Sequence, residues 1–138
     1  MRHFNKDSRD YDFIKKLEAG IALTGSDAKS LRTQTAQFAA SKIDILNGVP
    51  FLIGLNIPIY KYSHGQIIDP LRNRQLLLNT KEIALLQSYK HQKYALIPIS
   101  IFKSGKWFKV EIGIGRKFRK YEKREIIKAR EFQRSHSS

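Results

Sequence analysis

The stretch that decides the fold is SKIDILNGVPFLIGLNI, residues 41–57. Two runs typical of β-strands, 41–46 and 49–57, are joined by Asn47-Gly48, the dipeptide that a tight type I′ hairpin turn favours. Pro50 lies near the start of the second strand, where a missing ladder donor is tolerated. Alternation places four apolar residues of that strand on one face: Phe51, Ile53, Leu55 and Ile57.

A second hairpin is predicted toward the end of the chain. Residues 94–102 and 107–114 flank Lys103-Ser104-Gly105-Lys106, and apolar and polar residues alternate in the second run, where Trp107, Lys109 and Glu111 fall on the polar side. Pro98 indicates an edge strand or a bulge. Further strands are expected at residues 13–23 and 75–78.

Two helices are predicted between these strands. A short one begins at Thr24, where the Thr24 hydroxyl and the Asp27 carboxylate have the spacing of a capping box. The other spans about residues 80–91, with Asn79 as N-cap and Glu82 three residues later. The order strand, helix, hairpin, strand, helix, hairpin predicts a mainly β protein with α: a small, partly closed OB-like antiparallel β-barrel with two to three short helices.

The charge of the chain indicates its class of partner. The 138 residues include 26 Lys and Arg against 12 Asp and Glu, a formal charge of +14, and no Cys. Such an excess concentrates polyanions, so RNA is the expected partner. An anionic membrane is the alternative, and it would need an amphipathic helix with bulky apolar residues. The absence of Cys excludes disulfide scaffolds and thiolate metal sites and suggests a reducing cytoplasm.

Charge also divides the chain into a body, residues 1–114, and a basic C-terminal tail, residues 115–138. The tail holds nine basic and three acidic residues, a net +6. Lys120, Arg124 and Lys128 recur every four residues, so a helix would present them as one stripe. Because the tail has little apolar surface, we expect it to be disordered alone and helical on RNA. The alternative is an inert solubilising extension.

No constellation of catalytic or metal-binding residues stands out. The four His are not spaced as ligands, and no Ser or Thr sits in a nucleophile elbow, so a non-enzyme with no metal and no cofactor is expected. The longest apolar runs are about half the ~20 residues of a membrane helix, and the basic N-terminus lacks the hydrophobic region of a signal peptide. We therefore expect neither membrane insertion nor export.

Arg72 and Arg74 are the candidate phosphate contacts of the body. They alternate onto one face just before the leucine run 76–78, which is most simply a buried strand. A pair of guanidinium groups on one strand face suits phosphate oxygens. The alternative is two solvated arginines on an exposed strand.

Four blocks of sequence together resemble one known family, the SsrA-binding protein, also called small protein B. They occur in the family's order across residues 5–131: 18–25 with 29–32; 47–48 with 51–54; 69–74 with 76–79; and 110–113 with 121–124. The resemblance implies a bacterial, cytoplasmic trans-translation factor. It would bind the tRNA-like domain of tmRNA and deliver it to ribosomes stalled without a stop codon. By default, and apart from the resemblance, we expect a monomer that binds RNA 1:1.

The resemblance also implies which residues act. On the barrel, the family's RNA-binding positions map onto Glu18, Leu77 and Asn79, and a basic face of Lys29, Arg32, Arg72 and Arg74 could add contacts to phosphates and RNA shape. In the tail, the segment that senses the empty mRNA channel and the decoding centre of the small-subunit rRNA maps onto Tyr121-Glu122-Lys123-Arg124, with Arg119, Lys120 and Lys128 beside it. Glu122 stands where the family usually has Asp.

An alternative reading keeps the same charge and fold. A general structured-RNA-binding or ribosome-associated protein, without specificity for tmRNA, would also be basic and barrel-shaped. Only the four family blocks separate the two functions. A third reading, a hydrolase or transferase on a small barrel, has no residue set that supports it.

Overall fold

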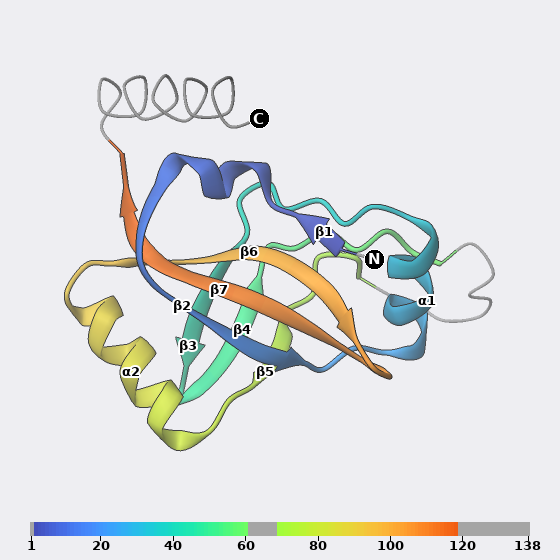
Figure 1. The fold of residues 1–138 in the computed structure, drawn as a ribbon. Helices are drawn as coiled ribbons and strands as arrows, with labels where there is room; N and C mark the ends of the chain where they lie inside the picture. Colours follow the sequence, from blue (N-terminus) through green and yellow to red (C-terminus); the bar gives the residue numbers. More distant parts are fainter. Residues whose placement is uncertain (1, 61–68, 119–138) are drawn as a thin grey trace.

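The computed structural model describes residues 2–60 and 69–118 (Figure 1). Seven strands and two α-helices are found in these ranges, with one 3-10 helix, η1. In chain order they are β1 (Arg2–Phe4), η1 (Lys6–Asp10), β2 (Tyr11–Ile21), α1 (Gly25–Thr33), β3 (Lys42–Leu46), β4 (Val49–Ile53), β5 (Arg74–Leu77), α2 (Thr80–His91), β6 (Ala95–Ser104) and β7 (Trp107–Lys117).

The described strands form an antiparallel sheet in the order β1-β6-β7-β2-β5-β4-β3. The sheet curls so that β6, β7 and β2 cross β3 and β4, as Figure 1 shows. The prediction of a mainly β, OB-like fold with two to three short helices is therefore confirmed. The curl stops short of a closed barrel, because β1 and β3 remain the end strands of the sheet.

The first predicted hairpin is confirmed at its turn. Asn47 and Gly48 both have positive φ, 52° and 78°, as a type I′ turn requires, and Leu46 pairs with Val49. The second strand is shorter than predicted. It ends at Ile53, because Gly54 adopts φ +77°, and a Cβ there would lie 2.7 Å from the Ala40 carbonyl oxygen.

The prediction that the apolar residues of this strand share one face is also wrong, because the chain turns at Gly54. Within β4, Pro50 and Leu52 point into the core, and Phe51 and Ile53 are only half-buried. Beyond the turn at Gly54, Leu55 and Ile57 are buried. The left-handed residue changes which positions of the alternation face inward.

The second predicted hairpin, β6 and β7, lies between β1 and β2 in the sheet. Pro98 lies at a bulge in β6, as its lack of an N–H donor predicted, and β7 pairs with both β6 and β2. The inner positions Val110, Ile112 and Ile114 have no exposed surface. Gly115 lies inside β7, one residue beyond the predicted end of this strand, against the bulged start of β2, where a Cβ would meet the Asp12 carbonyl oxygen at 2.1 Å.

β1 and η1 were not predicted from the sequence. β1 has only three residues, and its partner, residues 100–102 of β6, lies far along the chain. Side-chain hydrogen bonds hold it in place. The buried His3 ring joins the Leu31 carbonyl oxygen through Nε2 (2.8 Å) and accepts from the Ala36 N–H at Nδ1 (3.3 Å), while Asn5 donates to the Pro98 carbonyl (2.8 Å).

A buried ion pair connects α1 to the first residue of β5. The Arg74 side chain is 1% exposed and the Asp27 side chain 4%, and Arg74 Nε donates to the Asp27 carboxylate at 3.2 Å. Arg74 also donates to the carbonyl oxygens of Leu55, Pro70 and Arg72. With two bonds to Asp27, the five hydrogen bonds match the number of N–H donors of a guanidinium.

Asp27 serves two purposes at the start of α1. Its backbone N–H donates to the Thr24 hydroxyl (3.1 Å), so Thr24 is the N-cap as predicted. Its carboxylate, expected in a capping box, binds Arg72 and Arg74 instead. Burial acts to raise the pKa of Asp27, but the hydrogen bonds and positive charges of the two arginines outweigh it, and the pKa lies below its ordinary value.

We predict that Asp27→Asn lowers the free energy of unfolding by about 3–5 kcal/mol at neutral pH, because it leaves the Arg74 charge buried without a counter-charge. Chemical denaturation measures this loss. The control is Asp12→Asn at an exposed position, expected to change stability by less than about 0.5 kcal/mol.

The loss should also depend on pH. Because the folded pKa of Asp27 is depressed, the contribution of the ion pair is complete above the pKa of an unfolded aspartate, about 3.9, and is lost as the pH falls through the folded value. We therefore expect the difference between wild type and Asp27→Asn to be constant above about pH 5 and to shrink below about pH 4. A difference that stays constant through the acid range would contradict this assignment.

We further predict that Gly115→Ala lowers the free energy of unfolding by about 1–3 kcal/mol, because the added methyl group meets backbone of β2. Gly25→Ala is the matched control, since nothing lies within 4 Å of the added carbon at the start of α1. Thermal or denaturant unfolding of both variants checks the prediction. Equal stability of the two variants would show that β2 can move away at no cost.

Candidate nucleic-acid interface

The pairing of β2 with β5 sorts side chains onto two faces of the sheet. Gly20 pairs with Leu77, and Ile21 pairs with Leu76. Ile21 and Leu76 are buried in the core, whereas Leu77 points outward and is 60% exposed. Gly20 makes room for it, because a Cβ on Gly20 would lie 3.3 Å from the Leu77 side chain. An apolar side chain this exposed has no role in the core.

β7 extends the same outward row. Lys109 pairs with Gly20, and Glu111 pairs with Glu18. Trp107, two residues before Lys109 on the same side of the strand, is 76% exposed. Five residues of β2, β5, β7 and the start of α2 form one outward surface, which we call the outer face. They are Glu18, Leu77, Asn79, Trp107 and Lys109.

Asn79 enters this surface as the N-cap of α2. Its Oδ1 accepts from the Glu82 N–H (2.8 Å), and the Glu82 carboxylate accepts from the Asn79 N–H (3.1 Å), so Asn79 is the N-cap as predicted and forms a capping box with Glu82. The cap uses the side-chain oxygen and not the Nδ2 donors. Continuing the Gly20–Leu77 register by two residues puts Asn79 opposite Glu18. The fold thus gathers Glu18, Leu77 and Asn79 from segments about sixty residues apart.

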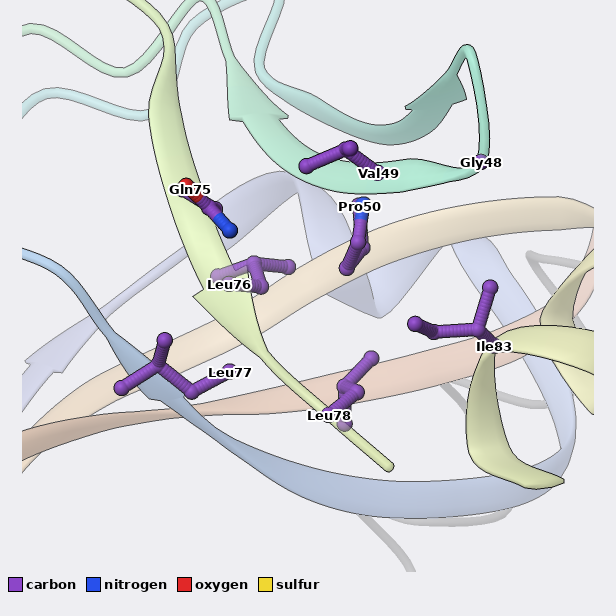
Figure 2. A pocket seen from close by; sticks show the side chains of 8 residues that line it. All are labelled: Gly48, Val49, Pro50, Gln75, Leu76, Leu77, Leu78 and Ile83. Carbon is purple, nitrogen blue, oxygen red and sulfur yellow. The ribbon is translucent and has the colours of Figure 1, made fainter. Parts of the chain in front are cut away.

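A groove of about 410 Å³ adjoins the outer face beside β5 (Figure 2). Figure 2 shows Pro50, Leu78 and Ile83 converging on it from the β3–β4 hairpin, the link after β5 and α2, while Leu77 lies on the side of β2. The groove is open and lined mostly by apolar side chains. This groove is a recess beside the outward side chains of β2 and β7.

The four predicted basic residues do not act alike. Lys29 and Arg32 are exposed on α1, and the Lys29 ammonium lies 5.7 Å from the centre of the Tyr60 ring. Arg72 is partly exposed, with a side-chain exposure of 27%, and binds Asp27. The prediction that Arg74 contacts phosphate is wrong in this structure, because the side chain is buried and its donors are all used within the protein.

The sequence prediction also missed Trp107 and Lys109 as site residues. The signal was present in the alternation of β7, where Phe108 and Val110 face inward and leave Trp107 and Lys109 outside. A large aromatic side chain at an outward strand position is the kind of platform on which bases stack.

The predicted tail residues lie outside the described part of the chain: Arg119, Lys120, Tyr121, Glu122, Lys123, Arg124 and Lys128. β7 continues to Lys117, so the first residues after the body belong to the sheet. Phe118 then donates its backbone N–H to the Asp10 carbonyl (2.8 Å). The last described residue is thereby fixed beside the start of β2.

In residues 2–60 and 69–118, no cluster of three His, Cys, Asp or Glu side chains could hold a metal ion. In the same ranges, the helices are too short or too polar to cross a membrane.

Comparison with known proteins gives one consistent result. The SmpB protein family matches residues 3–138. An SsrA-binding protein of Thermosipho africanus is 44% identical over 127 residues, 91% of this chain and 85% of that protein. One of Lactobacillus johnsonii is 40% identical over the same length, 91% of this chain and 84% of that protein.

The fold comparison agrees. A solved structure described as "tmRNA-SmpB: a journey to the center of the bacterial ribosome" matches with a TM-score of 0.72 and 31% identity, covering 91% of this chain and 94% of that one. Sequence and fold therefore lead to the same conclusion, that this chain belongs to the SmpB family.

Proposed function

We propose that the chain binds the tRNA-like domain of tmRNA with its outer face and delivers it to stalled bacterial ribosomes for trans-translation. One observation carries the assignment of the face: Glu18, Leu77 and Asn79, which the family resemblance singles out, come together on one exposed surface. The relatives are named SsrA-binding proteins, and the similar solved structure is described with tmRNA and the bacterial ribosome. Both support this function.

The chemistry of the outer face suits a folded RNA. Trp107 and Leu77 offer apolar surface to an exposed base or ribose, and Lys109 offers a charge to a phosphate. The Glu18 carboxylate accepts hydrogen bonds, so it can recognise a base amino group or a 2′-hydroxyl, which phosphate-binding lysines cannot do. This mixture reads the shape of an RNA as well as its charge.

The position where the described chain ends supports a separate role for the tail. β7 has eleven residues, so Lys117 lies about 30 Å along the strand from Trp107. A segment that starts there is well separated from the Trp107 end of the outer face. We propose that residues 119–128 bind the decoding centre and the empty mRNA channel, with the body holding the tRNA-like domain, and that the chain works as a monomer in the cytoplasm, where ribosomes are.

The outer face makes a specific prediction. Glu18→Ala, Leu77→Asn and Asn79→Ser should each weaken binding to a tmRNA tRNA-like domain by about 10- to 100-fold, or roughly 1–3 kcal/mol. Serine keeps the helix cap, so the third variant removes the amide donors without unwinding α2. Fluorescence anisotropy over a salt series measures the affinities.

Ile14→Asn is the control for these variants. Ile14 is 53% exposed on β2, six residues away from Gly20, and its replacement should leave the affinity unchanged. Retention of wild-type affinity by all three outer-face variants would refute the assigned surface. Equal, steeply salt-dependent binding of an unrelated structured RNA would favour the alternative, a general RNA-binding protein.

The tail makes a second prediction. Replacing Glu122, Lys123 and Arg124 with Ala should abolish tagging on stalled ribosomes, while binding of the tRNA-like domain stays within about twofold of wild type, because the outer face is intact. A reconstituted translation assay with a message that lacks a stop codon measures tagging. Normal tagging by this variant would contradict the proposed role of the tail.

A further inference from the structure

Glu82 is an acidic residue next to a surface proposed to bind RNA. It lies in the first turn of α2, three residues after Asn79 of the outer face, and it is half-buried. A carboxylate beside bound RNA repels the phosphates, so its charge does not explain why a glutamate stands at this position. Its hydrogen bond to Asn79 does.

The Glu82 carboxylate holds the backbone of Asn79. Its Oε1 accepts from the Asn79 N–H (3.1 Å), and no other acceptor for that N–H is found among the described residues. The pairing of β5 with β2 has ended two residues earlier, at Leu77, so the sheet does not fix Asn79. Glu82 therefore restrains the φ of Asn79, −78°, and with it the direction in which the Asn79 side chain leaves the backbone.

The same cap decides which end of the Asn79 amide faces outward. Its Oδ1 is engaged by the Glu82 N–H (2.8 Å), which leaves Nδ2 on the opposite branch of the planar group. Within residues 2–60 and 69–118, no protein acceptor is found for Nδ2. The amide thus offers two N–H donors to a ligand. In RNA, phosphate oxygens, ribose 2′-hydroxyls and base carbonyls can accept them.

Apolar side chains lock the same turn from the other side. Leu78, just before the cap, and Ile83, four residues after it, both line the groove beside β5 and converge there in Figure 2. These are the two positions of a hydrophobic staple, which fixes the angle at which a chain enters a helix. The staple and the capping box together tie Leu77 and Asn79 to one turn of fixed geometry.

We propose that Glu82 is a positioning residue for RNA recognition: it closes the capping box, and the box holds the Asn79 amide with its donors toward the RNA. This role rests on the proposed function of the outer face. The charge of Glu82 opposes RNA binding, whereas its hydrogen bond to Asn79 favours it. Because the two effects have opposite signs, substitutions can separate them.

The test compares two replacements of Glu82. Glutamine also closes a capping box, so Glu82→Gln keeps an acceptor for the Asn79 N–H and removes only the charge. We expect it to bind a tmRNA tRNA-like domain as tightly as wild type, or slightly more tightly. Glu82→Ala removes the acceptor as well, and we expect it to bind roughly three- to tenfold more weakly, the effect of one lost hydrogen bond. Fluorescence anisotropy at one salt concentration measures both affinities.

Gln87→Gly is the matched control for the stability of the helix. Gln87 is an exposed residue of α2, and glycine there weakens the helix about as much as loss of the capping box while leaving the cap intact. We expect Gln87→Gly and Glu82→Ala to lower the melting temperature by similar amounts. Only Glu82→Ala should weaken RNA binding.

Further variants link the effect to the amide of Asn79. Because Glu82 acts through that amide, adding Glu82→Ala to Asn79→Ser should cause no further loss of affinity. Asn79→Asp keeps the capping oxygen but has no amide donors. It should bind RNA at least as weakly as Asn79→Ser, while its melting temperature stays at or above that of wild type because a carboxylate suits a helix N-terminus.

Four results would overturn the proposal. Wild-type or tighter binding by Glu82→Ala would show that the carboxylate acts only through its charge, and an equal loss in Gln87→Gly would show that helix stability decides affinity. Additive losses in the double variant, or wild-type affinity of Asn79→Asp, would show that the Asn79 donors are not involved. Each of the first three leaves the proposed function standing if Asn79→Ser alone weakens binding. Wild-type affinity of all outer-face variants would instead refute the outer face, and the role of Glu82 with it.

Discussion

The rest of the structure depends on one buried cation. Arg74 lies in the interior with Asp27 as its counter-charge, and three backbone carbonyls complete its hydrogen bonds. A charge in the core is costly unless every donor is satisfied, so α1, the segment after β4 and the approach to β5 must all take their places together. The arrangement favours one geometry for these segments and starts β5 in the register that turns Leu77 outward.

Because side chains alternate along β5, its inward residues stabilise the core and its outward residue Leu77 is free to contact RNA. Arg74 and Leu76 point inward and stabilise the sheet, while Leu77 points outward from the next position. β7 repeats the division, with Val110 inside and Lys109 outside. Because neighbouring strands keep this alternation in step, a rigid core positions the strand residues of the outer face, the helix cap positions Asn79, and the surface is already formed before an RNA arrives.

Much of this could be read from the sequence. Local signals were strong at Asn47-Gly48, at the cap of α2 and at Pro98, and each predicted the element observed. The predictions failed where a distant partner decides the structure: β1 pairs with β6, and Arg74 finds Asp27 only after folding. An arginine that alternates with another on a strand looks the same whether it faces water or a buried carboxylate, so the sequence could not separate Arg74 from Arg72.

The pairing of β2 with β7 has a consequence for how the chain is made. These central strands join residues 11–21 to residues 107–117, so β2 has no partner on that side until most of the chain has left the ribosome. Contacts between such distant segments slow folding and leave strand edges exposed in the meantime. A product cut short before Trp107 would carry β2 with an open edge, ready to pair with other chains. Because β7 is synthesised after β2, the pairing of β7 with β2 is the folding step that protects the newly made protein from aggregation.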